Sequence, residues 1–156
     1  MEALLLAGGK GERLGEAAEG RPKPLVPVGG RPLAAYQVVQ LARAGATRVI
    51  VACSAGFEQL FQSELGGLGP EVVTVGEREP LGRGGGLRLA AAERQESGPV
   101  FALNGDELLD LDLARLRERH GELGGAATIV VSPLVSHLGV VDLEGDTVTG
   151  IREGPK

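Results

Sequence analysis

A short, continuous apolar run ends abruptly in glycines near the start of the chain. Residues 3–7 read Ala-Leu-Leu-Leu-Ala, and Gly8, Gly9 and Gly11 follow almost directly. A run that is apolar at every position is typical of a strand that is buried on both faces, as in parallel sheets covered by helices. The beginning of the chain therefore predicts a buried strand over residues 2–7 that ends in a glycine turn.

Segments with strand and helix patterns alternate along the rest of the chain. Further strands are expected over residues 47–53, 71–75, 100–103 and 126–132, and helices over residues 32–45, 57–65, 87–94 and 111–120. A hairpin is expected over residues 138–143 and 147–152. The alternation predicts an α/β fold of the three-layer, Rossmann-like kind, with a mostly parallel sheet and helices on both faces.

Length, charge and composition limit the classes of protein that fit. The 156 residues are enough for one domain with a core, so residues 1–156 are interpreted as a single domain. The net charge is -5 and only 3% of residues are aromatic, so we expect no nucleic-acid partner. No segment has the length of a membrane span and no signal peptide is visible, so we expect a cytoplasmic protein without a membrane partner. The single cysteine, Cys53, has apolar neighbours and is interpreted as a packed thiol.

The loop after the first strand has the parts of a polyphosphate site. Its glycines let backbone amides approach a phosphate, because any Cβ would hold the backbone away. Arg13 offers a guanidinium, and Lys23 offers an ammonium between two prolines that fix its backbone. The alternative is an ordinary tight turn with two solvated cations. The loop matches neither the Walker motif nor G-x-G-x-x-G.

A second candidate site follows the strand expected over residues 100–103. Gly105 permits a sharp turn there, and Asp106 comes next, at the edge where α/β sheets bind ligands. A carboxylate suits Mg²⁺, which takes few protein ligands and completes its shell with water and phosphate oxygens. The alternative is a turn or N-cap aspartate. No Cys/His cluster has zinc spacing, and neither His120 nor His137 is given a catalytic role.

Together these motifs resemble the sugar-1-phosphate nucleotidyltransferase family. The segment LAGGKGERL is similar to the family signature L-A-G-G-x-G-x-R-L, and RPKPLVPVGGRPL is similar to its continuation P-K-x-L-x-P-V-x-x-x-P-L. Three later segments, GEREPLGRGGGLRLA, LNGDELLDLDL and HLGVVDLEGDTVTGIREGPK, resemble later family motifs in the same order. The resemblance runs from residue 3 to residue 156 and implies a nucleotidyltransferase-type α/β domain without the family's C-terminal part.

The resemblance implies roles for residues of the strand-end loops. Arg13, Lys23 and Asp106 would be catalytic: Arg13 would bind the departing pyrophosphate, Lys23 the α-phosphate, and Asp106 the cofactor Mg²⁺. Glu153 would contact the hydroxyls of the sugar. The nucleotide-binding residues that the resemblance implies are Ala7, Gly8, Gly9, Gly11, Arg13, Lys23, Gly82 and Asp106.

The chain departs from the family pattern at several positions. Arg83 stands where the family has a small residue, Leu138 replaces a tyrosine, and Gly154 replaces the lysine that would bind the sugar phosphate. The family's later strands and its second metal-binding aspartate fall beyond Lys156. A sheet edge would then be open, and a homo-oligomer or association with another chain is one way to cover it.

The sequence therefore predicts an Mg²⁺-dependent nucleotidyltransferase. Its partners would be a nucleoside triphosphate and a phosphorylated small molecule, a sugar 1-phosphate, and it would release pyrophosphate. Such chemistry needs positioning and charge neutralisation more than a protein nucleophile. Two alternatives stay open: a nucleotide-binding or regulatory module of the same fold, and a guanylyltransferase that acts on a non-sugar phosphate of the molybdopterin or cobinamide type.

Overall fold

The computed structural model describes residues 1–9, 20–132 and 140–152. Contacts divide the chain into two compact units, Met1–Arg119 and His120–Lys156. The two units are described separately below, and the expectation of a single domain over residues 1–156 stays a prediction. Among the described residues, no helix is both long and apolar enough to cross a membrane.

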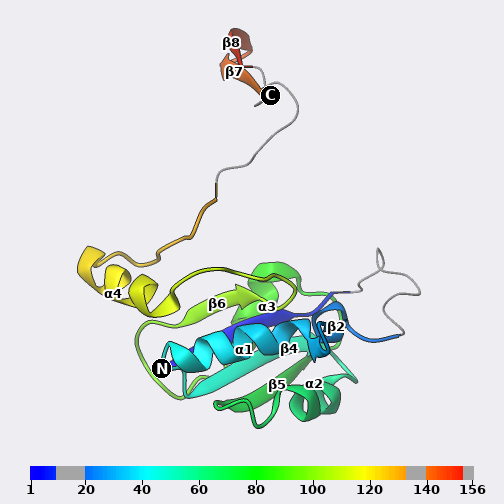
Figure 1. Cartoon of the computed structure of the whole chain (residues 1–156). Coiled ribbons are helices and arrows are strands. Elements are labelled where there is room, and N and C mark those ends of the chain that lie inside the picture. The colour runs from blue at the N-terminus through cyan, green and yellow to red at the C-terminus, as the bar shows by residue number, and fades with distance from the viewer. Residues whose placement is uncertain (10–19, 133–139, 153–156) are drawn as a thin grey trace. The chain divides into compact units, whose positions relative to one another are not determined.

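The first unit is built on a parallel four-stranded sheet with helices on both faces (Figure 1). The strand order is β5-β4-β1-β6, and the three pairings between neighbours are parallel. The strands are β1 (Glu2–Ala7), β4 (Arg48–Ser54), β5 (Glu71–Glu77) and β6 (Phe101–Asn104). The mostly parallel α/β architecture expected from the sequence is confirmed.

Alternate residues of β1 face different helices, which explains why the whole strand is apolar. Ala3, Leu5 and Ala7 pack in the core that includes residues of α1 (Leu33–Arg43) and α2 (Glu58–Leu65). Leu4 and the partly buried Leu6 pack on the other side, with residues of α3 (Gly82–Ala91). Because side chains of a strand alternate between faces, an apolar residue at every position indicates burial on both faces.

Short elements lead from β1 into the first helix. A 3₁₀ turn, η2 (Lys23–Leu25), precedes a two-stranded antiparallel ribbon of β2 (Pro27–Val28) and β3 (Arg31–Pro32). Leu25 is fully buried in the core that includes α1. This anchor holds Lys23, two residues earlier, close to the sheet.

The helix after β5 starts earlier than the sequence predicts. We expected a loop up to Gly86 and a helix over residues 87–94, and the observed α3 is Gly82–Ala91. Glycine is a poor helix former, so propensity favours a loop here. Packing decides otherwise, because a Cβ built on Gly86 would lie 3.0 Å from Leu6 Cδ2 and 2.7 Å from a carboxylate oxygen of Glu77. The glycine lets this helix lie close to the sheet.

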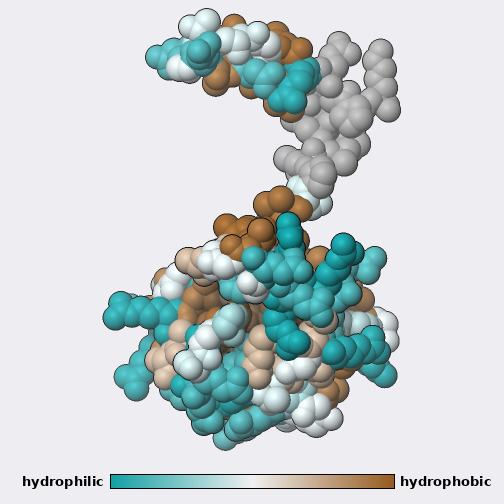
Figure 2. All heavy atoms as spheres, turned by 90° about the vertical axis from the view of Figure 1, so that its left-hand side faces the viewer, coloured by the Kyte–Doolittle hydropathy of each residue, from teal (hydrophilic) through white to brown (hydrophobic). Residues whose placement is uncertain are grey.

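The second unit contains a hairpin and an apolar segment that does not form a strand. The expected hairpin is present as β7 (Val140–Glu144) and β8 (Thr147–Arg152), and α4 (Leu113–Leu123) begins in the first unit and ends in this one. The strand expected over residues 126–132 is wrong, since these residues have no strand structure. A strand needs a partner for its backbone groups, and among the described residues β7 and β8 pair only with each other. The hairpin exposes hydrophobic side chains (Figure 2).

A buried carboxylate holds the amino-terminal end of β1. Glu2 is only 1% exposed and accepts hydrogen bonds from the backbone amides of Gln95 and Glu96, at 2.9 and 3.1 Å. Its oxygens also lie 3.4 Å from Nη1 of Arg48 and 3.3 Å from Nε of Arg94. Burial opposes the charge of Glu2, but these amides and guanidinium groups outweigh it and hold the pKa of Glu2 below its ordinary value of 4.5.

This arrangement makes the stability of the fold depend on pH. A folded-state pKa below the unfolded one adds stability at a pH above the unfolded value, and the gain is lost as the pH falls through the folded value. We expect Glu2→Gln to lower the free energy of unfolding by about 2 kcal/mol near neutral pH, because charged hydrogen bonds are lost. The difference from the unmutated chain should shrink below about pH 4, as measured by urea unfolding.

Glu71→Gln is the matched control. Glu71 contacts the same Arg48, with its Oε2 3.2 Å from Nε, but its side chain is mostly exposed. Such a pair contributes little to stability, so the control should have nearly the same free energy of unfolding as the unmutated chain. The difference in unfolding free energy between the Glu2→Gln variant and the unmutated chain should depend on pH. A difference that stays constant from neutral to acid pH would contradict the role given to the Glu2 charge.

Candidate functional site

The strand order reverses at β1, and the candidate site lies where it does. From β1 the chain moves outward to β4 and β5, and then returns to place β6 on the other side of β1. Because β1 and β6 are parallel neighbours, the loops that follow them leave the sheet at a common edge. The crevice outside such a switch point is where open α/β sheets bind ligands.

A tight turn after β6 is fixed directly to the end of β1. The backbone amide of Gly105 donates a hydrogen bond of 2.7 Å to the carbonyl oxygen of Leu6. A Cβ on this buried glycine would lie 3.0 Å from the same oxygen and 3.4 Å from side-chain atoms of Pro24. Glycine is thus required by close approach, and the turn presents the next residue, Asp106, at the edge of the sheet.

Two of the residues predicted to be catalytic form an ion pair. Nζ of Lys23 donates a hydrogen bond of 2.7 Å to Oδ2 of Asp106, although the two residues are 83 positions apart. Their side chains are 41% and 37% exposed, so both remain accessible. The loop after β1 and the turn after β6 therefore meet through charged groups.

The glycine turn after β1 lies against a carboxylate that the sequence analysis did not single out. A Cβ on Gly8 would come within 2.7 Å of Oε1 of Glu77, whereas a Cβ on Gly9 would meet nothing within 4 Å. Oε2 of Glu77 accepts a hydrogen bond of 3.3 Å from the amide of Leu81, just before α3. Glu77 is the last residue of β5, and that strand-end position was the signal that could have identified it.

Gly82 begins α3 beside this carboxylate. Its φ is +69°, a conformation that residues with a Cβ rarely adopt, so a glycine is favoured there. Arg83 follows it and is exposed. The segment that the resemblance relates to base binding therefore starts one residue after Leu81, whose amide bonds Glu77.

The residues present fit a metal ion that takes few protein ligands. The other oxygen of the Asp106 carboxylate, Oδ1, has no hydrogen-bond partner among the described residues, and the side chain is accessible. Within the same ranges, no group of three or more His, Cys, Asp or Glu side chains could enclose a metal. A single accessible carboxylate suits Mg²⁺ completed by phosphate oxygens and water, and not a tetrahedral zinc site.

Several of the sequence predictions fall elsewhere. Gly11, Arg13 and Glu153 lie outside the described residues, as do the departures at Leu138 and Gly154.

Cys53 is fully buried, and burial, with the nearby carboxylates of Glu58 and Glu77, raises the pKa of its thiol to about 12. Such a thiol is a packing group and not a nucleophile. Nδ1 of His120 lies 2.9 Å from Oγ1 of Thr128, away from these loops in sequence.

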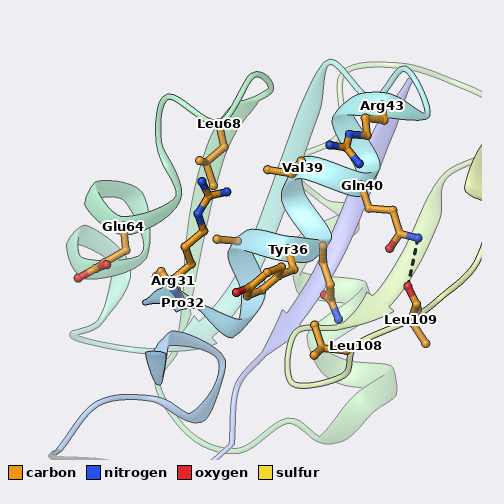
Figure 3. Close-up of a pocket in the computed structure, with 12 residues that line it drawn as sticks. Arg31, Pro32, Tyr36, Val39, Gln40, Arg43, Glu64, Leu68, Leu108 and Leu109 are labelled. Atoms are coloured by element: carbon orange, nitrogen blue, oxygen red, sulfur yellow. Dashed lines mark hydrogen bonds between the residues drawn. The ribbon is translucent and has the colours of Figure 1, made fainter. Parts of the chain in front are cut away.

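A groove of about 730 Å³ lies beside α1, between this helix, α2 and the segment after the Asp106 turn (Figure 3). Tyr36, Gln40 and Arg43 of α1 line it together with Leu108 and Leu109. Neither Lys23 nor Asp106 lines it, so the groove is separate from the charged pair.

Replacing Gly105 should lower the free energy of unfolding more than replacing a glycine that has open space around it. Gly105→Ala forces a Cβ against a carbonyl oxygen of the central strand, so we expect a loss of about 1–3 kcal/mol in unfolding free energy. Gly84→Ala is the control, because Gly84 lies in α3 with open space around its Cβ position. Alanine should stabilise that helix by up to about 1 kcal/mol. Equal shifts of the two melting temperatures would contradict this account of the turn.

Comparison with protein families gives a match over nearly the whole chain. A family model described as nucleotidyl transferase matches residues 2–156. A probable mannose-1-phosphate guanylyltransferase 1 of Oryza sativa subsp. japonica is 36% identical, over 100% of this chain and 46% of that protein. The mannose-1-phosphate guanylyltransferase catalytic subunit beta of Danio rerio is 38% identical, over 94% of this chain and 42% of that protein. The chain thus spans less than half the length of these relatives.

Solved structures agree with the fold. HddC from Yersinia pseudotuberculosis, in a complex with GMP-PN, is 25% identical with a TM-score of 0.65, over 99% of this chain and 70% of that one. A putative glucose-1-phosphate thymidylyltransferase from Bacillus anthracis has a TM-score of 0.75 at 21% identity, over 99% of this chain and 65% of that one. The latter identity is low, and the likeness shows the fold alone.

Proposed function

The chain belongs to the nucleotidyl transferase family, and on that premise we propose that it transfers a nucleoside monophosphate from a nucleoside triphosphate to a sugar 1-phosphate, releasing pyrophosphate. The observation that carries the proposal is the ion pair of Lys23 and Asp106 at the point where the strand order reverses. An ammonium and an accessible carboxylate beside a glycine turn are the groups that a triphosphate and its metal ion require.

In the proposed reaction, a phosphate oxygen of the sugar 1-phosphate attacks the α-phosphorus in line, and the bond to the β-phosphate oxygen breaks as pyrophosphate leaves. The protein contributes positioning and charge neutralisation. The ammonium of Lys23 has three donors and gives one to Asp106, so two remain for α-phosphate oxygens. Asp106 would hold Mg²⁺, which when bound neutralises phosphate charge. Arg13 and Glu153 are proposed to contact pyrophosphate and sugar, as the family resemblance implies.

We further propose guanosine triphosphate and mannose 1-phosphate as the substrates. Relatives named mannose-1-phosphate guanylyltransferases support this choice. Glu77 supports the base independently, because its carboxylate lies against Gly8 and Gly86. A carboxylate has two acceptor oxygens, which match the two adjacent N–H donors on the edge of guanine. Uracil and thymine offer one donor between two carbonyl oxygens, which a carboxylate would repel.

The direct test is pyrophosphate release from GTP and mannose 1-phosphate with Mg²⁺. Asp106→Ala should lower kcat by about 100-fold or more, as expected when a group that stabilises developing charge is lost. Asp110→Ala, an exposed carboxylate on the same loop, is the control and should keep its activity. Turnover that survives Asp106→Ala would show that the metal lies elsewhere.

Other outcomes separate the alternatives. A melting temperature that GTP raises, with no turnover by the unmutated chain, would support a nucleotide-binding module instead. Turnover with a non-sugar phosphate and not with any sugar 1-phosphate would support the other guanylyltransferase class. No release with any pair of substrates from folded protein would overturn the proposed transfer.

Base selectivity provides a separate prediction. Glu77→Gln replaces one acceptor oxygen by a donor, so it should lower kcat/KM for GTP by about 10- to 150-fold, the cost of a lost charged hydrogen bond. The value for UTP should change little or rise. Glu79→Gln, two residues along on the exposed loop, should leave the ratio of GTP to UTP unchanged. An unchanged ratio in Glu77→Gln would remove Glu77 from base recognition.

A further inference from the structure

A polar side chain of α1 is buried beneath the Asp106 turn. Gln37 is only 1% exposed, and its Nε2 donates hydrogen bonds to the carbonyl oxygens of Asn104, at 2.6 Å, and Glu107. An amide nitrogen has two N–H donors, so both are used. The two acceptors are the backbone groups immediately before and after the Gly105-Asp106 pair.

The burial of Gln37 is costly by itself. Its Oε1 is buried and has no hydrogen-bond partner among the described residues. An unsatisfied buried acceptor destabilises a fold by about 1–3 kcal/mol. The neighbouring buried residues of the same helix, Ala34, Val38 and Leu41, are apolar. The two hydrogen bonds to the turn therefore distinguish position 37 from the other buried positions of this helix.

The turn has few other supports on its C-terminal side. Residues 107–112 form neither helix nor strand. The amide of Gly105 is bonded to β1, and Nδ2 of Asn104 donates a 2.8 Å hydrogen bond to the exposed Glu107 side chain. Among the hydrogen bonds of the described residues, those of Gln37 join both ends of the turn to a helix.

We propose that Gln37 is a positioning residue, which holds the turn of residues 104–107 so that the carboxylate of Asp106 stays at the edge of the sheet. This inference rests on the proposed function, since the role of Asp106 there is to hold the metal ion. Gln37 acts through the turn and touches neither substrate nor metal. Its removal should therefore weaken metal binding while the affinity for the nucleotide itself stays the same.

The chain offers a matched control one helical turn away. Nε2 of Gln40 donates to the carbonyl oxygen of Leu109, at 3.2 Å (Figure 3), and to that of Leu111. Gln40 thus bonds the same segment in the same manner, but three or more residues beyond Asp106. A role limited to holding the segment to α1 would make the two glutamines equivalent, whereas positioning of Asp106 would distinguish them.

The test measures Mn²⁺ binding by electron paramagnetic resonance in the presence of a non-hydrolysable β,γ-imido analogue of GTP. Gln37→Met should raise the Kd for Mn²⁺ by about 10-fold or more, the usual cost of losing a group that orients a metal ligand. Asp106→Ala should raise it at least as much. Gln40→Met should stay close to the unmutated chain, and so should the metal-free affinity of each Gln variant for the analogue.

The possible results are decisive in each direction. Unchanged Mn²⁺ binding in Gln37→Met, with binding lost in Asp106→Ala, would overturn the role of Gln37 and leave the proposed function standing. Equal losses in Gln37→Met and Gln40→Met would also overturn it. No Mn²⁺ binding by the unmutated chain with the analogue would overturn both proposals. If Gln37→Met fails to fold, Gln37→Asn keeps the amide, withdraws it by one methylene, and should show the same loss.

Discussion

The parallel pairing of β1 with neighbours on both sides is the interaction on which the other features depend. The register joins Leu6 to Ala52 of β4 and to Asn104 of β6, so the ends of three strands are fixed relative to one another. Because β6 stops beside Leu6, its turn can bond the carbonyl oxygen of that residue. A shift of one residue in this register would exchange the two buried faces of the strand and carry Asp106 away from Lys23.

The sheet was predictable because its strands carry the information locally. The run over residues 3–7 is apolar on both faces, and observed burial on two sides follows from that pattern. The start of α3 was not predictable, because the fit of Gly86 against Leu6 depends on residues 80 positions apart. The strand predicted over residues 126–132 was wrong because an apolar pattern leads to a strand only when a partner strand is present to pair with it.

The candidate site was predictable in part, through residues whose sequence neighbours are unusual. Gly105 and the prolines around Lys23 mark special backbone positions, and their charged neighbours do form an ion pair. Glu77 and Gln37 have ordinary neighbours, so only the fold reveals what they contact. Gln37 is the clearer case, since a glutamine within a helix is usually a surface residue, and its burial becomes visible only with the turn after β6 in place.

The glycines of α3 have a consequence for motion. Gly84, Gly85 and Gly86 follow Gly82 in the first turns of this helix, and each lowers helix stability by about 1 kcal/mol relative to alanine. The amino-terminal turns of α3 should consequently open locally at a much smaller free energy than the sheet beneath them. The entropic cost of ordering this backbone would offset part of the free energy of binding of any ligand held there. Affinity at this edge would then fall steeply with temperature, while the strand that ends in Glu77 and the strand that precedes the Asp106 turn stay rigid.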